Sequence, residues 1–264
     1  MRMDNNRFFC INNISISFGG LEAVKDFSMK MKRSEIIGLI GPNGSGKTTL
    51  LNIITGLYKP KKGEIFFLNH KINGLKPHII GTLGISRTFQ NIRLFEDLTV
   101  KENVLIGRHS RVRSNLFADL FSLKYKIEIE KNAEQEINEI LKKFDMFKFK
   151  DRISSNLPYG IKRKLEITRA FASNPKILLL DEPAAGMNAQ ETRDLIKIIK
   201  KISENNIGVL LIEHNIKMVM NICKRIVVME EGKKIAEGNP NHVKNDPKVK
   251  EAYLGKEGIE NVIS

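Results

Sequence analysis

Short apolar runs that alternate with longer amphipathic segments dominate the pattern of hydrophobic and polar residues along this chain of 264 residues. Apolar runs of this length between turn residues are typical of strands that are buried on both faces. The sequence predicts such strands at 36–40, 177–180, 209–212 and 226–229. Because helical segments separate most of these strands, we expect an α/β fold with a mainly parallel sheet that is covered on both faces.

A different pattern occupies the first part of the chain. Between residues 8 and 32 the apolar and polar residues alternate in short pieces, interrupted by Gly19-Gly20, which predicts antiparallel strands. Residues 61–63 are predicted to form a turn before another strand at 64–68. The sequence therefore predicts an antiparallel β part beside the parallel sheet.

Helical periodicity is clearest in the middle of the chain, between about residues 100 and 149. One apolar face of this region is formed by Ala133, Ile137, Ile140, Leu141 and Phe144. Further helices are predicted at 162–172 and from about Ala189, where Asn188 and the glutamate three residues later match a capping box. Residues 239–246 are predicted to be loop-like and then weakly helical.

Composition adds a strong basic excess to this picture. The chain has 44 Lys and Arg against 30 Asp and Glu, a net charge of +14. Such an excess suits nucleic acid, anionic lipid or nucleotide as a partner. The basic residues are scattered along the chain, which favours a solvated surface instead. No apolar run approaches the roughly 20 residues that span a bilayer, so we expect that the chain does not cross a membrane by itself.

The stretch GPNGSGKTT carries the clearest chemical signal, because it fits the phosphate-binding pattern G-x-x-x-x-G-K-[ST]. Its residues are Gly41, Pro42, Asn43, Gly44, Ser45, Gly46, Lys47, Thr48 and Thr49. Glycines let backbone N–H groups face a phosphate, and the N-terminus of the following helix adds partial positive charge. Lys47 would reach the β- and γ-phosphates and Thr48 would ligate Mg²⁺. A glycine-rich turn with a chance lysine is the alternative, which the strand before and the helix after disfavour.

Two adjacent acids supply a second element. Asp181 follows a buried strand, where it is predicted to hold Mg²⁺ through water. Glu182 is predicted to alternate to the other side of the strand and to act as a general base toward an attacking water. The pair alone could be an ordinary strand end, but together with the phosphate loop it predicts nucleotide hydrolysis.

Three more segments narrow the class of protein. Residues 157–161 precede the acid strand, Gln90 lies between the two phosphate elements, and His214 follows the strand at 209–212. With these segments the chain resembles the ATP-binding subunits of ATP-binding-cassette (ABC) transporters over nearly its whole length. The resemblance implies one nucleotide-binding domain over 1–264. Its ATPase core with the antiparallel β part would occupy about 1–90 and 165–264, and its helical subdomain about 91–164.

The resemblance also implies a role for each matching residue. Phe18 would stack on adenine, although it could instead be a core residue. Gln90 would touch Mg²⁺ or water, and His214 would hold the γ-phosphate and the attacking water. Asn188, with residues 185–187, matches the loop that crosses the dimer interface. The signature segment, which contacts the γ-phosphate of the opposite subunit, corresponds to Leu157, Pro158, Tyr159, Gly160 and Ile161.

The signature segment departs from the usual Leu-Ser-Gly-Gly-Gln. Pro158 stands in place of the serine, Tyr159 in place of the first glycine and Ile161 in place of the glutamine. Because Pro158 has neither a hydroxyl nor an N–H group, the contact with phosphate would come from backbone amides, Gly160 and the helix N-terminus.

Several segments are similar to those of ATPase subunits of branched-chain amino-acid importers. They are 84–91, 93–95, 98–100 with 102–104, 181–186, the tail 251–255 and an additional helical stretch from His109 to about Lys131. This resemblance implies ATP and Mg²⁺ as cofactors and a second nucleotide-binding subunit, identical or paralogous. It also implies two transmembrane permeases, indirect coupling to an extracytoplasmic solute-binding protein, and a place on the cytoplasmic face of the cell membrane.

Other functions stay open at this point. A urea-type importer or a lipid exporter would use the same ATPase, since the cargo does not touch this chain. A nucleic-acid-associated ABC ATPase would suit the positive charge but usually carries paired cassettes or a long coiled coil, so no nucleic-acid partner is expected. A nucleotide-binding regulator is disfavoured by the combination of Glu182 and His214.

Overall fold

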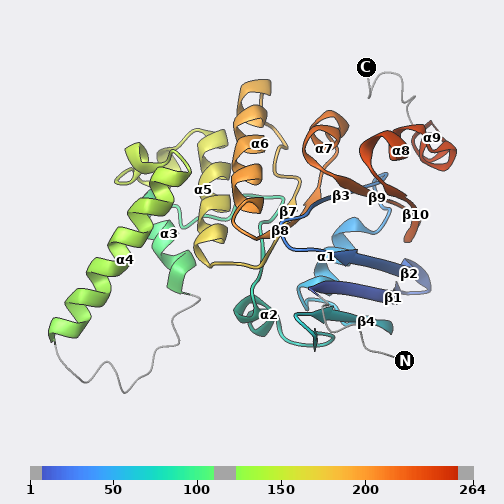
Figure 1. The fold of residues 1–264 in the computed structure, drawn as a ribbon, viewed down its shortest axis with the longest axis horizontal. Coiled ribbons are helices and arrows are strands. Elements are labelled where there is room, and N and C mark those ends of the chain that lie inside the picture. The colour runs from blue at the N-terminus through green and yellow to red at the C-terminus, as the bar shows by residue number, and fades with distance from the viewer. Residues whose placement is uncertain (1–7, 110–122, 255–264) are drawn as a thin grey trace.

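The computed structural model describes residues 8–109 and 123–254. Two β-sheets and the helices that pack on them make up this part of the chain (Figure 1). The strands are β1 (Phe9–Phe18), β2 (Leu21–Met31), β3 (Ile36–Ile40), β4 (Lys62–Phe67), β5 (His70–Lys71), β6 (Ile85–Arg87), β7 (Ile177–Asp181), β8 (Gly208–Ile212), β9 (Arg225–Glu230) and β10 (Lys233–Gly238). The helices are α1 (Lys47–Ile54), α2 (Pro77–Leu83), α3 (Val100–His109), α4 (Leu123–Lys143), α5 (Tyr159–Ala172), α6 (Ala189–Ser203), α7 (Ile216–Ile222), α8 (Pro240–Asn245) and α9 (Pro247–Leu254), with 3₁₀ turns η2 (Phe147–Phe149) and η3 (Ser154–Asn156).

The larger sheet is the predicted parallel one. Its strand order is β10-β9-β3-β8-β7-β6, and every pair is parallel except the edge strand β10 with β9. Every residue of β3, β7 and β8 is buried. These strands are covered on both faces, which explains their unbroken apolar sequence.

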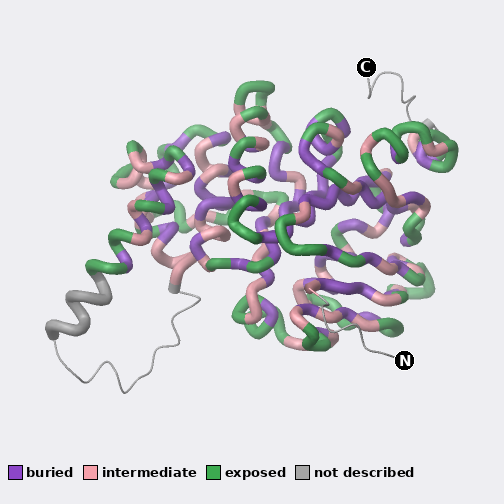
Figure 2. Tube along the Cα trace, in the orientation of Figure 1, coloured by how far each residue is buried: buried purple, intermediate pink, exposed green. Residues whose placement is uncertain are grey.

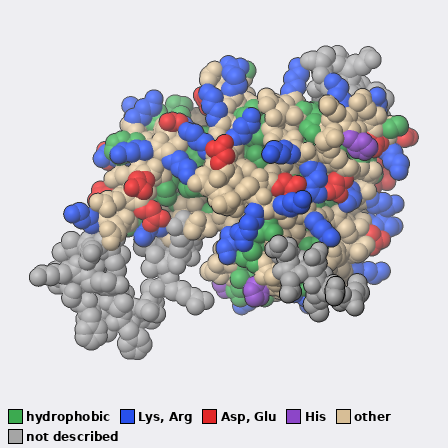
Figure 3. Space-filling model, in the orientation of Figure 1, with side chains coloured by type: hydrophobic (Ala, Val, Ile, Leu, Met, Phe, Trp, Pro, Cys, Tyr) green, Lys and Arg blue, Asp and Glu red, His purple; other side chains and the backbone are tan. Residues whose placement is uncertain are grey.

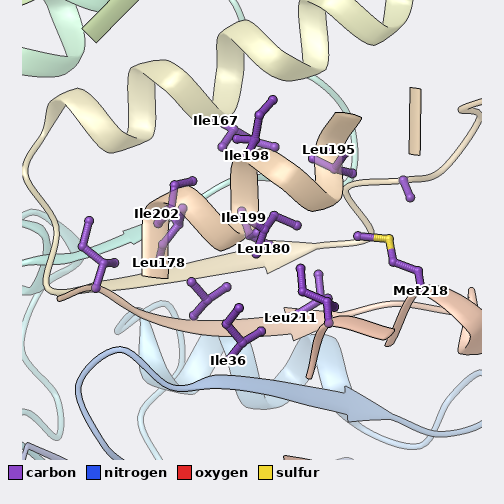
Figure 4. Packing of buried hydrophobic residues seen from close by; sticks show 14 of the residues in the cluster. Ile36, Ile167, Leu178, Leu180, Leu195, Ile198, Ile199, Ile202, Leu211 and Met218 are labelled. Carbon is purple, nitrogen blue, oxygen red and sulfur yellow. The ribbon is translucent and has the colours of Figure 1, made fainter. Parts of the chain in front are cut away.

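Alternate side chains of the parallel sheet enter two different cores. Leu178 and Leu211 face the helical side, where they meet Ile199 and its neighbours on α6 (Figure 4). Leu179 and Leu210, one position along their strands, belong to a core with α1 and the antiparallel sheet. Figure 2 shows the buried positions concentrated along these central strands. The predicted cover on both faces is confirmed.

The smaller sheet has the order β2-β1-β4-β5 and is antiparallel throughout, as predicted. The predicted turn at 61–63 is wrong, because β4 begins at Lys62. Gly63 has φ +80°, and a Cβ there would lie 2.4 Å from the carbonyl oxygens of Asn12 and Asn13. The glycine therefore serves the irregular pairing of β4 with β1, and it does not end the strand.

Helices α3, α4 and α5 lie together at one end of the molecule (Figure 1). The predicted apolar face is confirmed, since Ala133, Ile137, Ile140, Leu141 and Phe144 are all buried. Of the additional helical stretch predicted from His109 to Lys131, residues 110–122 lie outside the described residues, and 123–131 belong to α4.

Helix boundaries confirm one prediction and correct two. Asn188 and Glu191 form the predicted capping box at the start of α6. Helix α5 begins at Tyr159, earlier than predicted, because Pro158 occupies the N-cap position. The region at 239–246 is helix α8, whose first turn is capped by the Asn239 side chain. Among the described helices, none has the length and apolarity needed to cross a bilayer.

Candidate functional site: a phosphate loop at the carboxyl edge of the parallel sheet

The predicted phosphate loop, acid pair and histidine meet at one edge of the parallel sheet. The loop follows β3, Asp181 and Glu182 stand at the end of β7, and His214 follows β8. A cavity of about 780 Å³ opens there. It is lined by Gly20, Leu21, Glu22, Ala23, Lys25, Asn43, Gly44, Ser45, Gly46, Lys47, Thr48, Thr49, Glu182, His214, Glu231, Gly232 and Lys233.

Close backbone neighbours explain two of the loop glycines. A Cβ at Gly41 would lie 2.0 Å from the carbonyl oxygen of Met229, and one at Gly46 would lie 2.3 Å from that of Ala23. Gly46 is the N-cap of α1 with φ +101°. Because it has no side chain to satisfy the first N–H groups of α1, these donors are left for an anion in the loop.

Lys47 lies beneath the loop with an exposed fraction of only 6%. Its Nζ donates to the carbonyl oxygens of Gly41 and Pro42, both at 2.8 Å, and to Ser45 Oγ at 3.3 Å. Burial lowers the pKa of Lys47, and the charges of Glu182 and Asp181 oppose this shift. The ammonium is therefore held by the loop itself.

Glu182 leaves the strand in a direction that the sequence did not predict. Strand β7 ends at Asp181, and Glu182 has φ +48°, so the predicted alternation to the other side of the strand is wrong. This left-handed backbone turns the carboxylate between two other predicted residues. Glu182 Oε1 lies 2.7 Å from His214 Nε2, and Glu182 Oε2 accepts a hydrogen bond from Gln90 Nε2 at 2.9 Å. Strained backbone of this kind is typical of functional sites.

Asp181 is buried and paired with a residue to which sequence reasoning gave no role. Its Oδ2 accepts from Arg87 NH2 at 2.8 Å, and Arg87 NH1 donates to Asn52 Oδ1 at 2.7 Å. A buried carboxylate requires a counter-charge, so Arg87, which lies with Gln90 in the segment 84–91, could have been predicted as the partner of Asp181.

The oxygen donors near the loop fit magnesium. The described residues contain no cluster of three or more His, Cys, Asp or Glu side chains suited to a metal. Magnesium is usually held by one or two carboxylates together with substrate phosphates and water. The Thr48 hydroxyl, the Asp181 carboxylate and the Gln90 amide oxygen match that partial set, so the ion would be bound jointly by protein and nucleotide.

The signature segment lies apart from the phosphate loop of the same chain. Leu157 is buried in the helical core and Ile161 packs against that core, while Pro158 and Tyr159 are exposed. A Cβ on Gly160 would lie 2.3 Å from Glu191 Oε1. In the described part of the chain, none of these five signature residues lines the phosphate-loop cavity. The exposed side of this segment and the first backbone N–H groups of α5 are therefore available to a molecule outside the phosphate-loop cavity of the same chain.

Two other predicted residues make local contacts. Phe18 is 45% exposed, and its ring lies edge-on to Tyr58 with centroids 5.1 Å apart, so a core role for Phe18 is excluded. The Asn188 side chain accepts from the backbone N–H groups of Gln190 and Glu191, both at 2.9 Å. Asn188 thus has a structural role as the cap of α6.

Comparison with known proteins identifies the class. A family model described as ABC transporter matches residues 24–185, and one described as branched-chain amino acid ATP-binding cassette transporter matches residues 233–259. The chain belongs to the ABC transporter family and is one of its nucleotide-binding ATPases.

Individual relatives cover nearly the whole chain. It is 41% identical to the high-affinity branched-chain amino acid transport ATP-binding protein BraF of Pseudomonas aeruginosa, and 40% identical to LivG of Escherichia coli, which carries the same description. Each match covers 93% of this chain and 97% of the relative. The lipopolysaccharide export ATP-binding protein LptB of Haemophilus influenzae is 33% identical, over 93% of this chain and 96% of the relative.

Solved structures share the fold. A nucleotide-free ATP-binding cassette from an ABC transporter superposes with a TM-score of 0.81 at 34% identity, covering 94% of this chain and 99% of that one. A dimeric cassette bound to ADP and phosphate has a TM-score of 0.72 at 26% identity, covering 88% and 98%. The predicted fold class, a P-loop nucleoside triphosphatase core with an antiparallel β part and a helical part, is confirmed.

Replacing Lys47 tests the phosphate loop. We expect Lys47→Ala to weaken nucleotide binding about 10- to 100-fold, because it removes charge-assisted hydrogen bonds to the phosphates. Isothermal titration with ATP and ADP measures the change. The exposed Lys71, which pairs with Glu64 on the antiparallel sheet, provides the control Lys71→Ala. Equal affinities for the two variants would contradict the assigned role of Lys47.

Proposed function

We propose that this ATPase powers a membrane importer for branched-chain amino acids. The phosphate loop and catalytic residues do not distinguish cargo, because all ABC ATPases need them. The observation that carries the proposal is the match of residues 233–259, outside these motifs, to the branched-chain amino acid family model. The higher identity to BraF and LivG than to the lipopolysaccharide exporter subunit points the same way.

Two subunits would close around two ATP molecules. Each ATP would lie between residues 41–49 of one subunit and residues 157–161 of the other. The separation of these segments within one chain supports this arrangement, as does the dimeric form of a related cassette. The second subunit is another copy of this chain or a paralogue.

Hydrolysis would then run through Glu182. A water held by Glu182 and His214 attacks the γ-phosphorus, the bond to the β-γ bridging oxygen breaks, and the proton of the water passes to the Glu182 carboxylate. Lys47 would bind the β- and γ-phosphate oxygens, and Phe18 would stack on adenine. Bound Mg²⁺, held by Thr48, Asp181 and Gln90, would neutralise charge on the phosphates.

Closure would be converted into movement of the membrane partners. The helical part at about 91–164 would shift relative to the core at about 1–90 and 165–264, and residues 89–95 would push on two transmembrane permeases. The subunit would lie at the cytoplasmic face of the membrane, and a solute-binding protein outside would deliver the cargo to the permeases. The description of the relatives as transport ATP-binding proteins supports partners of this kind.

The distribution of charge on one face of the molecule can be compared with what nucleic-acid binding requires. On the face drawn in Figure 3, Lys and Arg side chains are dispersed among acidic ones and form no continuous stripe. Nucleic-acid binding by charge requires such a patch or stripe.

Glu182→Gln separates binding from hydrolysis. The amide cannot accept the proton, so we expect ATP binding within about twofold of wild type and turnover reduced at least about 10²-fold. Because the ATP then persists, the closed dimer should accumulate, which analytical ultracentrifugation with ATP and with ADP would detect. Turnover like that of wild type would contradict the role of Glu182.

Uptake measurements test the cargo. Deleting the gene in its source organism should lower the uptake of labelled leucine, isoleucine and valine, and leave urea uptake unchanged. The wild-type gene should restore uptake, whereas the Glu182→Gln gene should not, because transport requires ATP turnover. Unchanged amino-acid uptake together with a defect in urea uptake or lipid export would assign the chain to that other system.

A further inference from the structure

Glu213 is a buried acid to which the proposed reaction gives no role. It lies directly before His214 and is only 4% exposed. Its Oε1 accepts from the backbone N–H of Ala184 at 2.6 Å, and its Oε2 accepts from those of His214 and Asn215 at 3.2 and 3.4 Å. One carboxylate thus joins the loop after β7, which carries Glu182, to the loop after β8, which carries His214.

A carboxyl group in this position is costly to the fold. Burial raises the pKa of Glu213, and the backbone N–H groups of Ala184, Asn215 and His214 oppose that shift. An apolar residue would fill the same space without this desolvation cost. An apolar residue could not accept hydrogen bonds from the backbone of both loops at once, which requires two acceptor oxygens on one rigid group.

The loop that Glu213 holds is also bonded to the signature segment. Tyr159, the first residue of α5, donates from its hydroxyl to the carbonyl oxygen of Ala185 at 2.9 Å. Ala185 follows Ala184, whose N–H group is bound by Glu213. A continuous path therefore leads from Tyr159 through residues 184 and 185 to Glu213 and His214.

A second path leads from the same helix to Gln90. Arg163, one turn after Tyr159 and fully buried, donates to the carbonyl oxygens of Gln90 at 2.6 Å and Phe89 at 2.7 Å. The side chains of His214 and Gln90, which form hydrogen bonds with Glu182, are thus both connected to the first turns of α5.

We propose that Glu213 is a positioning residue, which makes the placement of His214 beside Glu182 depend on what the start of α5 contacts in the partner subunit. The proposal rests on the shared ATP site proposed above. A shift of Tyr159 would move residues 184 and 185, and Glu213 would pass this movement to the backbone of His214. Hydrolysis in one site would in this way follow engagement of the other.

Glu213→Gln in the full-length chain tests the proposal. The amide keeps the shape, but its NH₂ group cannot accept a hydrogen bond, so one of the two loops is released. We expect kcat for ATP hydrolysis to fall about tenfold, the effect of losing one such hydrogen bond in the transition state, with KM for ATP changed less than about twofold.

Glu35→Gln is the matched control. The Glu35 carboxylate also accepts a backbone N–H, that of Lys32 at 2.8 Å, and pairs with Arg225, but it lies at the opposite end of β3. This variant should lower stability and leave kcat unchanged. A kcat for Glu213→Gln within twofold of wild type, or reduced only as much as in Glu35→Gln, would overturn the proposal.

Tyr159→Phe tests the path from its other end. The side chain is exposed, so the variant should fold, and hydrogen exchange of the amides at 214 and 215 should become several-fold faster when its hydroxyl is lost. In kcat, the double variant with Glu213→Gln should be no worse than the worse single variant, since both interrupt one path. Unchanged exchange, or losses that multiply, would overturn the proposal.

Two outcomes separate this proposal from the proposed function. Absence of ATP turnover in wild type, or turnover that does not depend on Glu182, would contradict the proposed function. Hydrogen exchange of the amides at 214 and 215 in Tyr159→Phe would then still test whether Tyr159 is coupled to His214. Normal turnover in wild type with normal kcat in Glu213→Gln would contradict the role of Glu213 alone.

Discussion

The parallel pairing of β3, β8 and β7 is the constraint on which the site depends. Leu39 and Asp181 both pair with Ile212, so the three strands end level with one another. The phosphate loop, Glu182 and His214 each follow one of these ends. Because the sheet is packed on both faces, a slip of one residue would exchange the two cores. The burial of every residue in these strands therefore also fixes the geometry of the candidate site.

Within that frame, polar contacts set the orientation of individual side chains. The left-handed backbone at Glu182 is held by its N–H bond to the carbonyl oxygen of Ile212 at 2.9 Å. The neighbouring Asp181 is held by Arg87. Adjacent residues with the same type of side chain therefore have different surroundings, a buried ion pair for one and a partly open cavity for the other. This difference suits the separate roles proposed for them, Asp181 as a metal ligand and Glu182 as the general base.

Much of the fold and part of the site could be predicted from the sequence because their signals are local. The phosphate loop is one continuous stretch, and the buried strands are continuous apolar runs. Helix α8 was predicted only as weakly helical because its signals are a cap, Asn239, and a proline, without apolar periodicity. The left-handed backbone at Glu182 was not predicted because glutamate does not favour this conformation.

The polar contacts that connect the site could not be predicted in the same way. Arg87 and Asp181 are 94 residues apart, Arg163 and Gln90 73 apart, and Glu213 and Ala184 29 apart. No spacing rule relates such pairs, since only the folded sheet and the packing of α5 bring them together. The candidate site residues could be predicted from the sequence, whereas Arg87, Arg163 and Glu213, which hold them in place, are identified by the structure.

The central claim is that each ATP site is shared by two subunits, and mixing two inactive variants of this chain tests it most directly. Lys47→Ala removes the phosphate contact, and Tyr159→Glu places a carboxylate where the partner's phosphate is expected. At concentrations where the protein dimerises with ATP, random pairing gives mixed dimers with one intact site each, so turnover should rise above the mean of the two separate variants, to at most about a quarter of wild type. Turnover of the mixture no higher than the mean of the two separate variants would contradict a shared site.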